Sequence, residues 1–380
     1  MKILFISHSS AFFGAERSMW EAVAGLIEQG VTVETVVPAE GELGERLRAL
    51  NVPVHLIPHT WWVGFGHWRK FYYRMRRRLQ NHIAASQFDR LLRQSKFDLV
   101  VSNTLTIPAG AFAARRSRIP HVWFVHEFGR EDHDFHFDLG APRSFALMNQ
   151  LSACIIANSH AVAHSLRAYI PEEKLRVVYQ SVEVAPNTQP TWTRGDLEEL
   201  NLIYVGRLAP GKRQEDAIKA LAILIRKGLK LHLTLLGPDV LAYGQEMRRL
   251  SKELKVTEHV DFVGNVPDPE TNLAFADLSL ICSRSEAFGR VTIEAMKAGK
   301  PVIGANTAGT AELISDGVNG FTFAMGDAAD LARKIEILYH DPSLRKEMGR
   351  RGQAWAAENF RRDRFGADLL RVFTEVVLPD

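Results

Sequence analysis

Short apolar runs alternate with longer amphipathic stretches along most of the chain, and this alternation limits the fold more than any other feature. The runs have the composition of strands, and they fall at residues 2–7, 31–37, 52–57, 98–102, 121–125, 154–158, 202–205, 231–236, 260–263, 278–282 and 301–305. Strands that alternate with helices form mostly parallel sheets with helices packed on both faces. The sequence therefore predicts an α/β fold with doubly wound sheets.

The length of 380 residues predicts two domains, because a single hydrophobic core seldom organises a chain of this size. Residues 184–199 are rich in Pro, Thr and Asn, a composition typical of a linker. We therefore expect a first domain at 1–185, a linker at 186–199 and a second domain at 200–360. A last helix is expected at 361–380.

Composition narrows the class of protein. Hydrophobic residues make up 46% and charged residues 24% of the chain, as in soluble globular proteins. The net charge of +3 is too small to indicate a nucleic-acid partner. No apolar run approaches the roughly 18 residues of a membrane span, and residues 1–8 form a strand pattern rather than a signal peptide. Cys154 and Cys282 lie in apolar runs and are expected to be buried thiols. We expect a cytoplasmic protein that can still contact the inner face of a membrane.

The segment at 278–299 carries the clearest functional pattern. A buried strand at 278–282 leads into a loop, and a helical pattern begins after Gly289 and stops at Gly299. In open α/β sheets ligands bind where such loops leave the carboxyl ends of strands. Glu286 in the loop and Glu294 on the helix are separated by seven residues. Phosphate would repel both carboxylates, so we expect them to accept hydrogen bonds from hydroxyls, such as those of a sugar.

This segment resembles the Glu-x7-Glu signature of retaining glycosyltransferases with the two-domain GT-B fold, most closely those of family 4. The spacing alone is common, and an ordinary loop with an exposed helical Glu would also produce it. The resemblance is specific because Glu286 stands in Ser-Glu-Ala-Phe-Gly and the helix is followed by Ala-Gly-Lys-Pro-Val-Ile-Gly. It covers almost the whole chain. It implies two Rossmann-like domains that face each other across a cleft, with the helix at 361–380 crossing back to the first.

The resemblance assigns the nucleotide-sugar donor to the second domain. Residues 206–212 match a Gly-Arg-Leu-x-x-x-Lys motif in which Arg207 and Lys212 hold the donor diphosphate. Glu294 would accept hydrogen bonds from the ribose and Glu286 from the transferred sugar. The backbone of Val266 would contact the nucleotide base. The remaining predicted donor-binding residues are Ala287, Phe288 and Gly289 in the loop.

The first half of the chain supplies two further candidates. Gly14 lies in the loop after the first strand, where a glycine allows close approach of a ligand. This loop resembles the Gly-Gly-x-Glu motif of the family, near the donor diphosphate and the acceptor, although Phe13 replaces the first Gly. His126 follows the strand at 121–125. The resemblance implies that His126 points toward the transferred sugar, which makes His126 and Glu286 the predicted catalytic residues.

Residues 61–78 combine aromatic and basic side chains, and no acidic residue occurs from 46 to 88. Aromatic residues beside Arg and Lys suggest contact with an anionic membrane surface or a lipid diphosphate. Alternatively, the segment is a solvated basic helix whose apolar stripe packs on the core. Nucleic acid is a third reading, disfavoured by the modest net charge. The predicted acceptor or membrane contacts are Trp61, Trp62, Trp68, Arg69, Lys70, Arg74, Arg76 and Arg77.

These observations predict a retaining glycosyltransferase that moves a hexose or deoxyhexose from a UDP- or GDP-sugar to a glycan or lipid-linked acceptor, in bacterial surface polysaccharide or lipopolysaccharide synthesis. We expect no cofactor and no metal, because the two cations would neutralise the diphosphate. His133 and His136 form a loose metal-like pattern that no second cluster completes, so residues 131–138 are interpreted as a flexible acceptor loop. The alternatives are a catalytically silent sugar-nucleotide-binding partner and a nucleotide-sugar epimerase of related fold.

Overall fold

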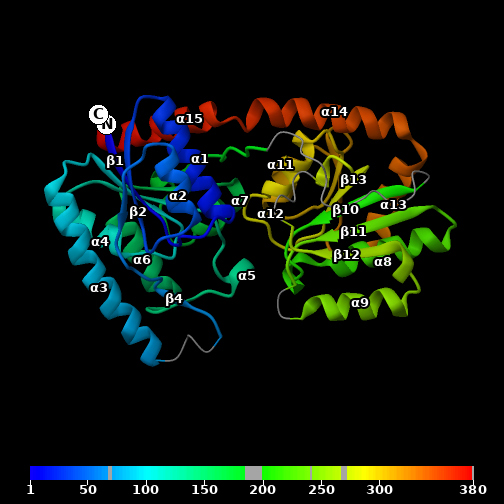
Figure 1. Cartoon of the computed structure of the whole chain (residues 1–380), viewed down its shortest axis with the longest axis horizontal. Helices are drawn as coiled ribbons and strands as arrows, with labels where there is room; N and C mark the ends of the chain where they lie inside the picture. The colour runs from blue at the N-terminus through cyan, green and yellow to red at the C-terminus, as the bar shows by residue number, and fades with distance from the viewer. Residues whose placement is uncertain (67–70, 185–198, 240–241, 267–271, 379–380) are drawn as a thin grey trace. The chain divides into compact units, whose positions relative to one another are not determined.

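The computed structural model describes residues 1–66, 71–184, 199–239, 242–266 and 272–378. Its contacts divide the chain into two compact units, Met1–Val182 with Phe360–Asp380, and Glu183–Asn359 (Figure 1). The predicted linker at 186–199 lies, apart from Glu199, outside the described residues. None of the helices in the described part of the chain has the length and apolar character needed to cross a membrane.

The first unit is built on a parallel sheet whose strands, among the described residues, follow the order β3-β2-β1-β5-β6-β8-β9. Most of their side chains are buried and apolar, as expected for strands covered on both faces. The order reverses between β1 and β5. The strands are β1 (Lys2–Ile6), β2 (Thr32–Val37), β3 (Val54–Leu56), β5 (Leu99–Asn103), β6 (His121–Val125), β8 (Cys154–Ala157) and β9 (Leu175–Val177).

The helices of the first unit include one from the end of the chain. In α15 Gly366 packs against Gly25 of α1, and a Cβ at Gly366 would lie 2.3 Å from the Gly25 carbonyl oxygen. This backbone contact places α15 on the first sheet. The helices are α1 (Gly14–Glu28), α2 (Glu42–Ala49), α3 (Phe71–Gln94), α4 (Ala109–Ser117), α5 (Arg130–His133), α6 (Ala141–Leu151), α7 (His160–Leu166) and α15 (Arg362–Val377).

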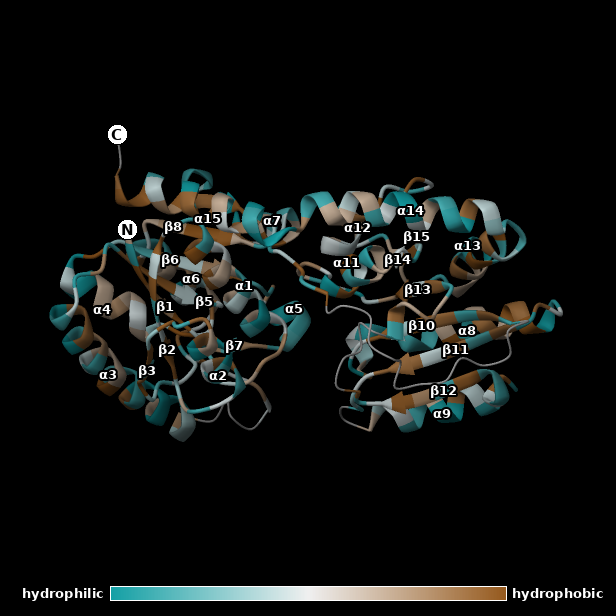
Figure 2. Cartoon of the chain, turned by 45° about the horizontal axis from the view of Figure 1, so that its top comes forward, coloured by the Kyte–Doolittle hydropathy of each residue, from teal (hydrophilic) through white to brown (hydrophobic). Residues whose placement is uncertain are grey.

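The second unit holds a parallel sheet with the order β12-β11-β10-β13-β14-β15 in its described part. The order reverses between β10 and β13. Figure 2 shows its strands as mostly hydrophobic and its helices as mixed. The strands are β10 (Leu200–Val205), β11 (Leu231–Leu236), β12 (Val260–Gly264), β13 (Leu278–Ile281), β14 (Val302–Ala305) and β15 (Gly320–Phe323), and the helices are α8 (Gln214–Arg226), α9 (Tyr243–Glu253), α11 (Arg290–Lys297), α12 (Ala308–Leu313), α13 (Ala328–His340) and α14 (Pro342–Asn359).

Each sheet therefore has one point at which the chain changes direction across the strand order. Loops that follow the two strands at such a point diverge, and a crevice forms outside their carboxyl ends where ligands bind in open α/β sheets. In the first unit this point lies between β1 and β5, and in the second between β10 and β13. The predicted α/β doubly wound architecture is confirmed in both units.

Candidate functional site

The two segments predicted to hold the donor follow neighbouring strands of the second sheet. Leu202 and Ile203 of β10 pair in parallel with Leu278 and Ser279 of β13. The loop that carries Arg207 and Lys212 therefore lies beside the loop that carries Glu286. A backbone hydrogen bond joins the two loops, from the Arg284 N–H to the Gly211 carbonyl, at 2.9 Å. The structure brings these predicted residues together at the point where the strand order reverses.

Tyr204 is hydrogen-bonded to both loops. It is buried on β10, and its hydroxyl donates to the Lys212 carbonyl at 2.6 Å and lies 3.3 Å from the Ser283 hydroxyl. Burial raises the pKa of Tyr204 well above its ordinary value, so the phenol keeps its proton as a donor. The sequence analysis missed this residue. The available signal was a phenol in the strand β10, whose other residues apart from Asn201 are apolar.

Lys212 and Glu286 form an ion pair across the two loops, with their side chains 25% and 20% exposed. Burial by itself would raise the pKa of Glu286, but the charge and hydrogen bond of Lys212, a hydrogen bond from Ser283 and the charge of Arg207 hold it below its ordinary value. Glu286 is thus a charged acceptor next to two cations. Arg207 is exposed beside them. The group can bind a ligand that carries both anionic oxygens and hydroxyls.

The backbone of the Glu286 loop is positioned by α12. The Gly309 N–H donates to the Glu286 carbonyl at 2.9 Å, and a Cβ at Gly309 would lie 2.8 Å from the carbonyl oxygens of Ala287 and Phe288. Phe288 is buried. Gly289 has a φ of 94°, a backbone conformation that residues with a side chain rarely adopt. These contacts fix the direction in which the loop enters α11.

The remaining donor-binding candidates, Glu294 and Val266, differ in burial. Glu294 on α11 is buried and lies 3.8 Å from Arg290, measured between Oε1 and Nε. It is therefore not the exposed helical Glu of the alternative interpretation. Val266 follows β12 and is partly exposed. It lies at the same edge of the sheet but two strands away from β10.

In the first unit Asn103 joins the two predicted loops. Gly14 is exposed at the start of α1, and His126 follows β6. The Asn103 side chain at the end of β5 donates to the Ala15 carbonyl at 2.9 Å and accepts from His126 Nε2 at 2.7 Å. The same hydrogen bond requires the proton of His126 to be on Nε2. The role of Asn103 was missed, since a polar residue ending a strand is a weak signal.

Glu127 is a buried carboxyl that holds the backbone of His126. Its two oxygens accept from the Leu105 N–H and the His126 N–H, each at 2.9 Å. Burial, assisted by the charge of Asp132, raises the pKa of Glu127 to about 8. The group was also missed, because burial of a carboxyl is a tertiary property that local sequence does not reveal.

The structure corrects part of the prediction for residues 61–78. Trp62 is buried, stacks on Trp123 and donates from its indole nitrogen to the Leu105 carbonyl at 2.8 Å. Arg77 is buried and ion-paired with Asp138. Both side chains are buried within the first unit, so the prediction that they contact an acceptor or membrane is wrong.

The other members of that prediction differ in exposure. Trp61 is partly buried and donates to the His8 carbonyl at 2.9 Å. Arg74 is partly buried and hydrogen-bonds the Asp138 carbonyl, whereas Arg76 is exposed. The predicted contacts Trp68, Arg69 and Lys70 lie outside the described residues.

The predicted acceptor loop at 131–138 contains regular structure. It includes the end of α5 and the strand β7 (His136–Phe137), which pairs with β4 (Val63–Gly64). Asp132 accepts from the backbone N–H groups of Phe128 and Gly129, so the segment is not wholly irregular, whereas its flexibility and its contact with an acceptor stay predictions. In the described part of the chain no group of three or more His, Cys, Asp or Glu residues could hold a metal ion.

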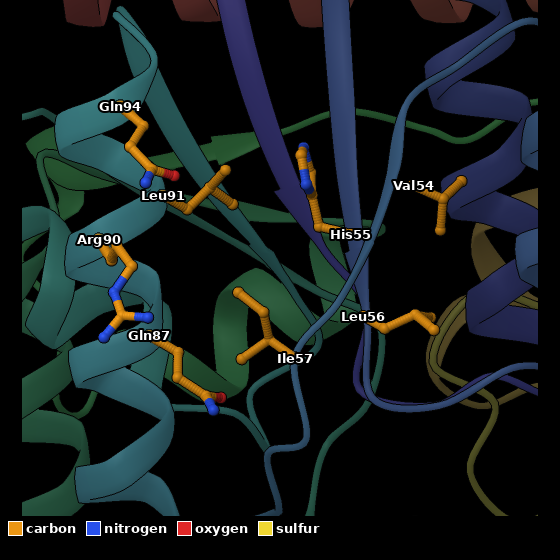
Figure 3. Close-up of a pocket in the computed structure, with 8 residues that line it drawn as sticks. All are labelled: Val54, His55, Leu56, Ile57, Gln87, Arg90, Leu91 and Gln94. Atoms are coloured by element: carbon orange, nitrogen blue, oxygen red, sulfur yellow. The ribbon is translucent and has the colours of Figure 1, made fainter.

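A hollow of about 440 Å³ lies elsewhere in the first unit (Figure 3). It is bounded by the edge strand β3 on one side and by α3 on the other, as the labelled side chains show. Its lining includes His55 and Arg90, and none of the predicted donor or catalytic residues. The hollow is therefore separate from the candidate site.

Comparison with known families covers both units. Residues 13–185 match the model described as Glycosyltransferase Family 4, and residues 193–355 match the model described as Glycosyl transferases group 1. The chain belongs to the family 4, group 1 glycosyltransferases. The glycosyltransferase motifs at Arg207, Lys212, Glu286 and Glu294 fall within the second match.

Curated relatives match parts of this chain. The putative glycosyltransferase EpsD of Bacillus subtilis is 34% identical over 42% of this chain and 41% of its own length. The N-acetyl-alpha-D-glucosaminyl L-malate synthase of Bacillus anthracis is 26% identical over 60% of this chain and 61% of its own length. The chain thus spans about half the length of these two relatives.

Solved structures share the fold over nearly the whole chain. Anabaena Alr3699/HepE in complex with UDP has a TM-score of 0.80 at 23% identity, covering 99% of this chain and 100% of that one. The apo form of the lipopolysaccharide outer core galactosyltransferase WaaB has a TM-score of 0.73 at 18% identity, covering 99% and 100%. The fold of this chain is GT-B.

We expect Gly309→Ala to displace the Glu286 loop. The new methyl group would lie within 2.9 Å of three carbonyl oxygens, so the free energy of unfolding should fall by about 1–3 kcal/mol. Urea denaturation measures this change. The matched control is Gly211→Ala, where nothing lies within 4 Å of the added Cβ. Equal stability of the two variants would contradict the proposed packing.

Glu127 should make stability depend on pH. Its pKa in the folded state is about 8, above the ordinary 4.5, so the stabilisation it contributes is complete below about pH 4.5 and is lost as the pH rises to about 8. The slope is at most roughly 1.4 kcal/mol per pH unit. Urea denaturation at pH 5 and pH 8 should show a smaller loss of stability for Glu127→Gln than for the unchanged protein. Glu347→Gln, at a partly exposed carboxylate of α14, should keep the original slope, and an unchanged slope in Glu127→Gln would refute the assignment.

Proposed function

We propose that this protein is a retaining glycosyltransferase that moves a hexose or deoxyhexose from a UDP- or GDP-sugar to a hydroxyl group. The observation that carries the proposal is the joining of Lys212 and Glu286 at the reversal point between β10 and β13. A cation for a diphosphate and a carboxylate for sugar hydroxyls stand side by side there. Anabaena HepE, which shares the fold, has been crystallised with UDP and with UDP-glucose, which favours a UDP-sugar among the donors.

The donor would be held by groups of different chemistry. Arg207 offers a planar pair of donors and Lys212 a compact charge, and together they neutralise the diphosphate as it leaves. Backbone N–H groups at the start of α11 would assist them. Glu294 would accept from the ribose hydroxyls, and backbone groups at Val266 would contact the base. No metal is required in this proposal, because the two cations supply the neutralising charge.

The ion pair between Lys212 and Glu286 prepares the site for this donor. It favours the charged form of Glu286 without a ligand, against burial, which by itself raises the pKa of this carboxyl. When a diphosphate binds, its oxygens would share the Lys212 charge. Glu286 would then accept hydrogen bonds from the sugar hydroxyls and align the anomeric carbon.

In the reaction the bond from the anomeric carbon to the diphosphate oxygen breaks, and a bond to the acceptor oxygen forms on the same face. The acceptor proton passes to an oxygen of the departing diphosphate. We assign to His126 the orientation of the transferred sugar, a role for which Asn103 and Glu127 hold its ring and its backbone. This assignment and the retention of configuration rest on the family resemblance.

We further propose a glycan or lipid-linked acceptor in the synthesis of a bacterial surface polysaccharide or lipopolysaccharide. WaaB, which shares the fold, is named for the lipopolysaccharide outer core. The basic and aromatic character of residues 61–78 favours an acceptor that is presented at an anionic membrane. Enzyme action would then take place at the inner face of the membrane.

The proposal is tested by measuring nucleotide release from UDP-, GDP-, ADP- and dTDP-sugars without added metal. We expect slow hydrolysis of one UDP- or GDP-sugar. Glu286→Gln should lower turnover about 100-fold or more, while the affinity for the free nucleotide changes little, because Glu286 contacts the sugar. The control is Glu347→Gln, at a partly exposed carboxylate of α14 that is paired with Arg350 and Arg351.

Two results would overturn this proposal. Binding of a donor with no turnover, and a loss of affinity alone in Glu286→Gln, would indicate a catalytically silent sugar-nucleotide-binding partner. Release of an altered sugar nucleotide instead of free nucleotide would indicate an epimerase. Where a product forms, the anomeric configuration measured by NMR tests retention directly.

A further inference from the structure

Helix α3 carries apolar side chains on two opposite faces. On the buried face Ala84, Ala85 and Phe88 pack into the hydrophobic core of the first unit. On the other face five large side chains are exposed, and we call them the α3 stripe. They are Phe71, Tyr72, Met75, Leu79 and Ile83, with exposed fractions of 73%, 69%, 45%, 62% and 52%.

The spacing of these residues explains why the core leaves them uncovered. Tyr72, Met75, Leu79 and Ile83 recur at intervals of three and four residues, which places them along one line of a helix. The buried residues Asn81, Ala84 and Phe88 recur in the same way on the opposite side. The structure therefore decides against the interpretation that the apolar stripe of this segment packs on the domain core.

The α3 stripe is limited to the first half of the helix. In the later turns the same line continues with Ser86 and Arg90, which are exposed polar residues. The stripe thus ends where an ordinary solvated helix surface begins. Exposed apolar patches that are rimmed by polar residues mark sites of contact with proteins or membranes.

The charge around the α3 stripe is positive. Arg76 and Arg78 are exposed on either side of it, with Arg78 also donating to the Asp138 carbonyl at 3.3 Å. No acidic residue occurs from 46 to 88. The Asp138 carboxylate, which lies near this part of α3, is buried in its ion pair with Arg77 and offers no exposed negative charge.

We propose that the first half of α3 is a docking surface for an anionic lipid membrane. The α3 stripe enters the boundary between headgroups and acyl chains, with Tyr72 at the interface, and Arg76 and Arg78 contact lipid phosphates. A second copy of the chain fits this face poorly, because a symmetric contact would bring Arg against Arg with no acidic partner in the segment. The surface is independent of the donor chemistry and extends the proposed function by locating the protein's membrane contact.

The proposal differs from the sequence-based prediction in the residues that it names. Trp62 and Arg77 belong to the core, and Arg74 is partly buried against Asp138. Leu79 and Ile83, which lie beyond the basic run, become the main apolar contacts. The exposure of side chains on one helical face, and not the basic composition alone, selects the surface.

The test uses the full-length protein and sedimentation with two kinds of vesicle, neutral phosphatidylcholine and phosphatidylcholine with phosphatidylglycerol. We expect binding to the anionic vesicles, weakened by salt, and little binding to the neutral ones. The double variant Leu79→Ser with Ile83→Ser should lower the partition coefficient about tenfold. Ile337→Ser is the matched apolar control, an exposed residue on α13.

Charge is tested on the same helix. Arg76→Gln should weaken binding to anionic vesicles several-fold, whereas Arg93→Gln in the last turn of α3 should leave it unchanged. Since all these side chains are exposed, urea denaturation should give equal stability for the variants. Equal binding to both vesicle types, undiminished binding of the double variant, or a dimer in solution that the double variant dissolves would overturn the proposal. Donor hydrolysis is measured in parallel and should be unchanged, which separates this result from the proposed activity.

Discussion

The parallel pairing of β10 with β13 is the constraint on which the rest of the candidate site depends. It brings together two loops whose residues Arg207 and Glu286 are 79 positions apart in the sequence. The Tyr204 hydroxyl then secures both loops at their bases, at the Lys212 carbonyl and the Ser283 hydroxyl. Because the phenol is buried and neutral, it holds this position without titrating near neutral pH. Tyr204 thus holds the two loops that carry the ion pair of Lys212 and Glu286.

In the first unit, too, a buried polar side chain connects segments from different elements, but this side chain is an amide and not a phenol. Asn103 stands at the reversal point of its sheet and holds the Ala15 carbonyl and the His126 ring with one amide group. Glu127 fixes the backbone at the same place through two N–H groups. In both units a buried polar side chain at the end of a strand connects loops from two elements. Such groups position partly exposed residues, such as His126, Lys212 and Glu286, whose chemistry is easier to predict from the sequence.

The sequence predicted the fold well because local patterns determine it. Apolar runs and glycines marked the strands and the loops after β10 and β13, and the motifs there identified the family. The roles of Tyr204, Asn103 and Glu127 were not predicted, because they depend on burial and on partners distant in the sequence. Trp62 and Arg77 were misassigned for the same reason: composition predicted a surface, whereas Trp123 and Asp138, which lie about 60 residues later, place both in the core. Periodicity identified the line of Tyr72 to Ile83 correctly, but only the packing of α3 revealed which face is exposed.

We propose that the two loops act as one nucleotide-sugar site because Tyr204 holds them together. The most direct measurement is the calorimetric affinity of Tyr204→Phe for UDP and GDP. Loss of the hydroxyl removes only buried hydrogen bonds, worth about 1 kcal/mol each, and should weaken nucleotide binding about fivefold although Tyr204 would not touch the ligand. Tyr339→Phe, which also removes a hydroxyl that bonds backbone, at Lys230, is the control and should bind normally. Unchanged affinity in Tyr204→Phe, or no binding of either nucleotide by the unaltered protein, would contradict the account.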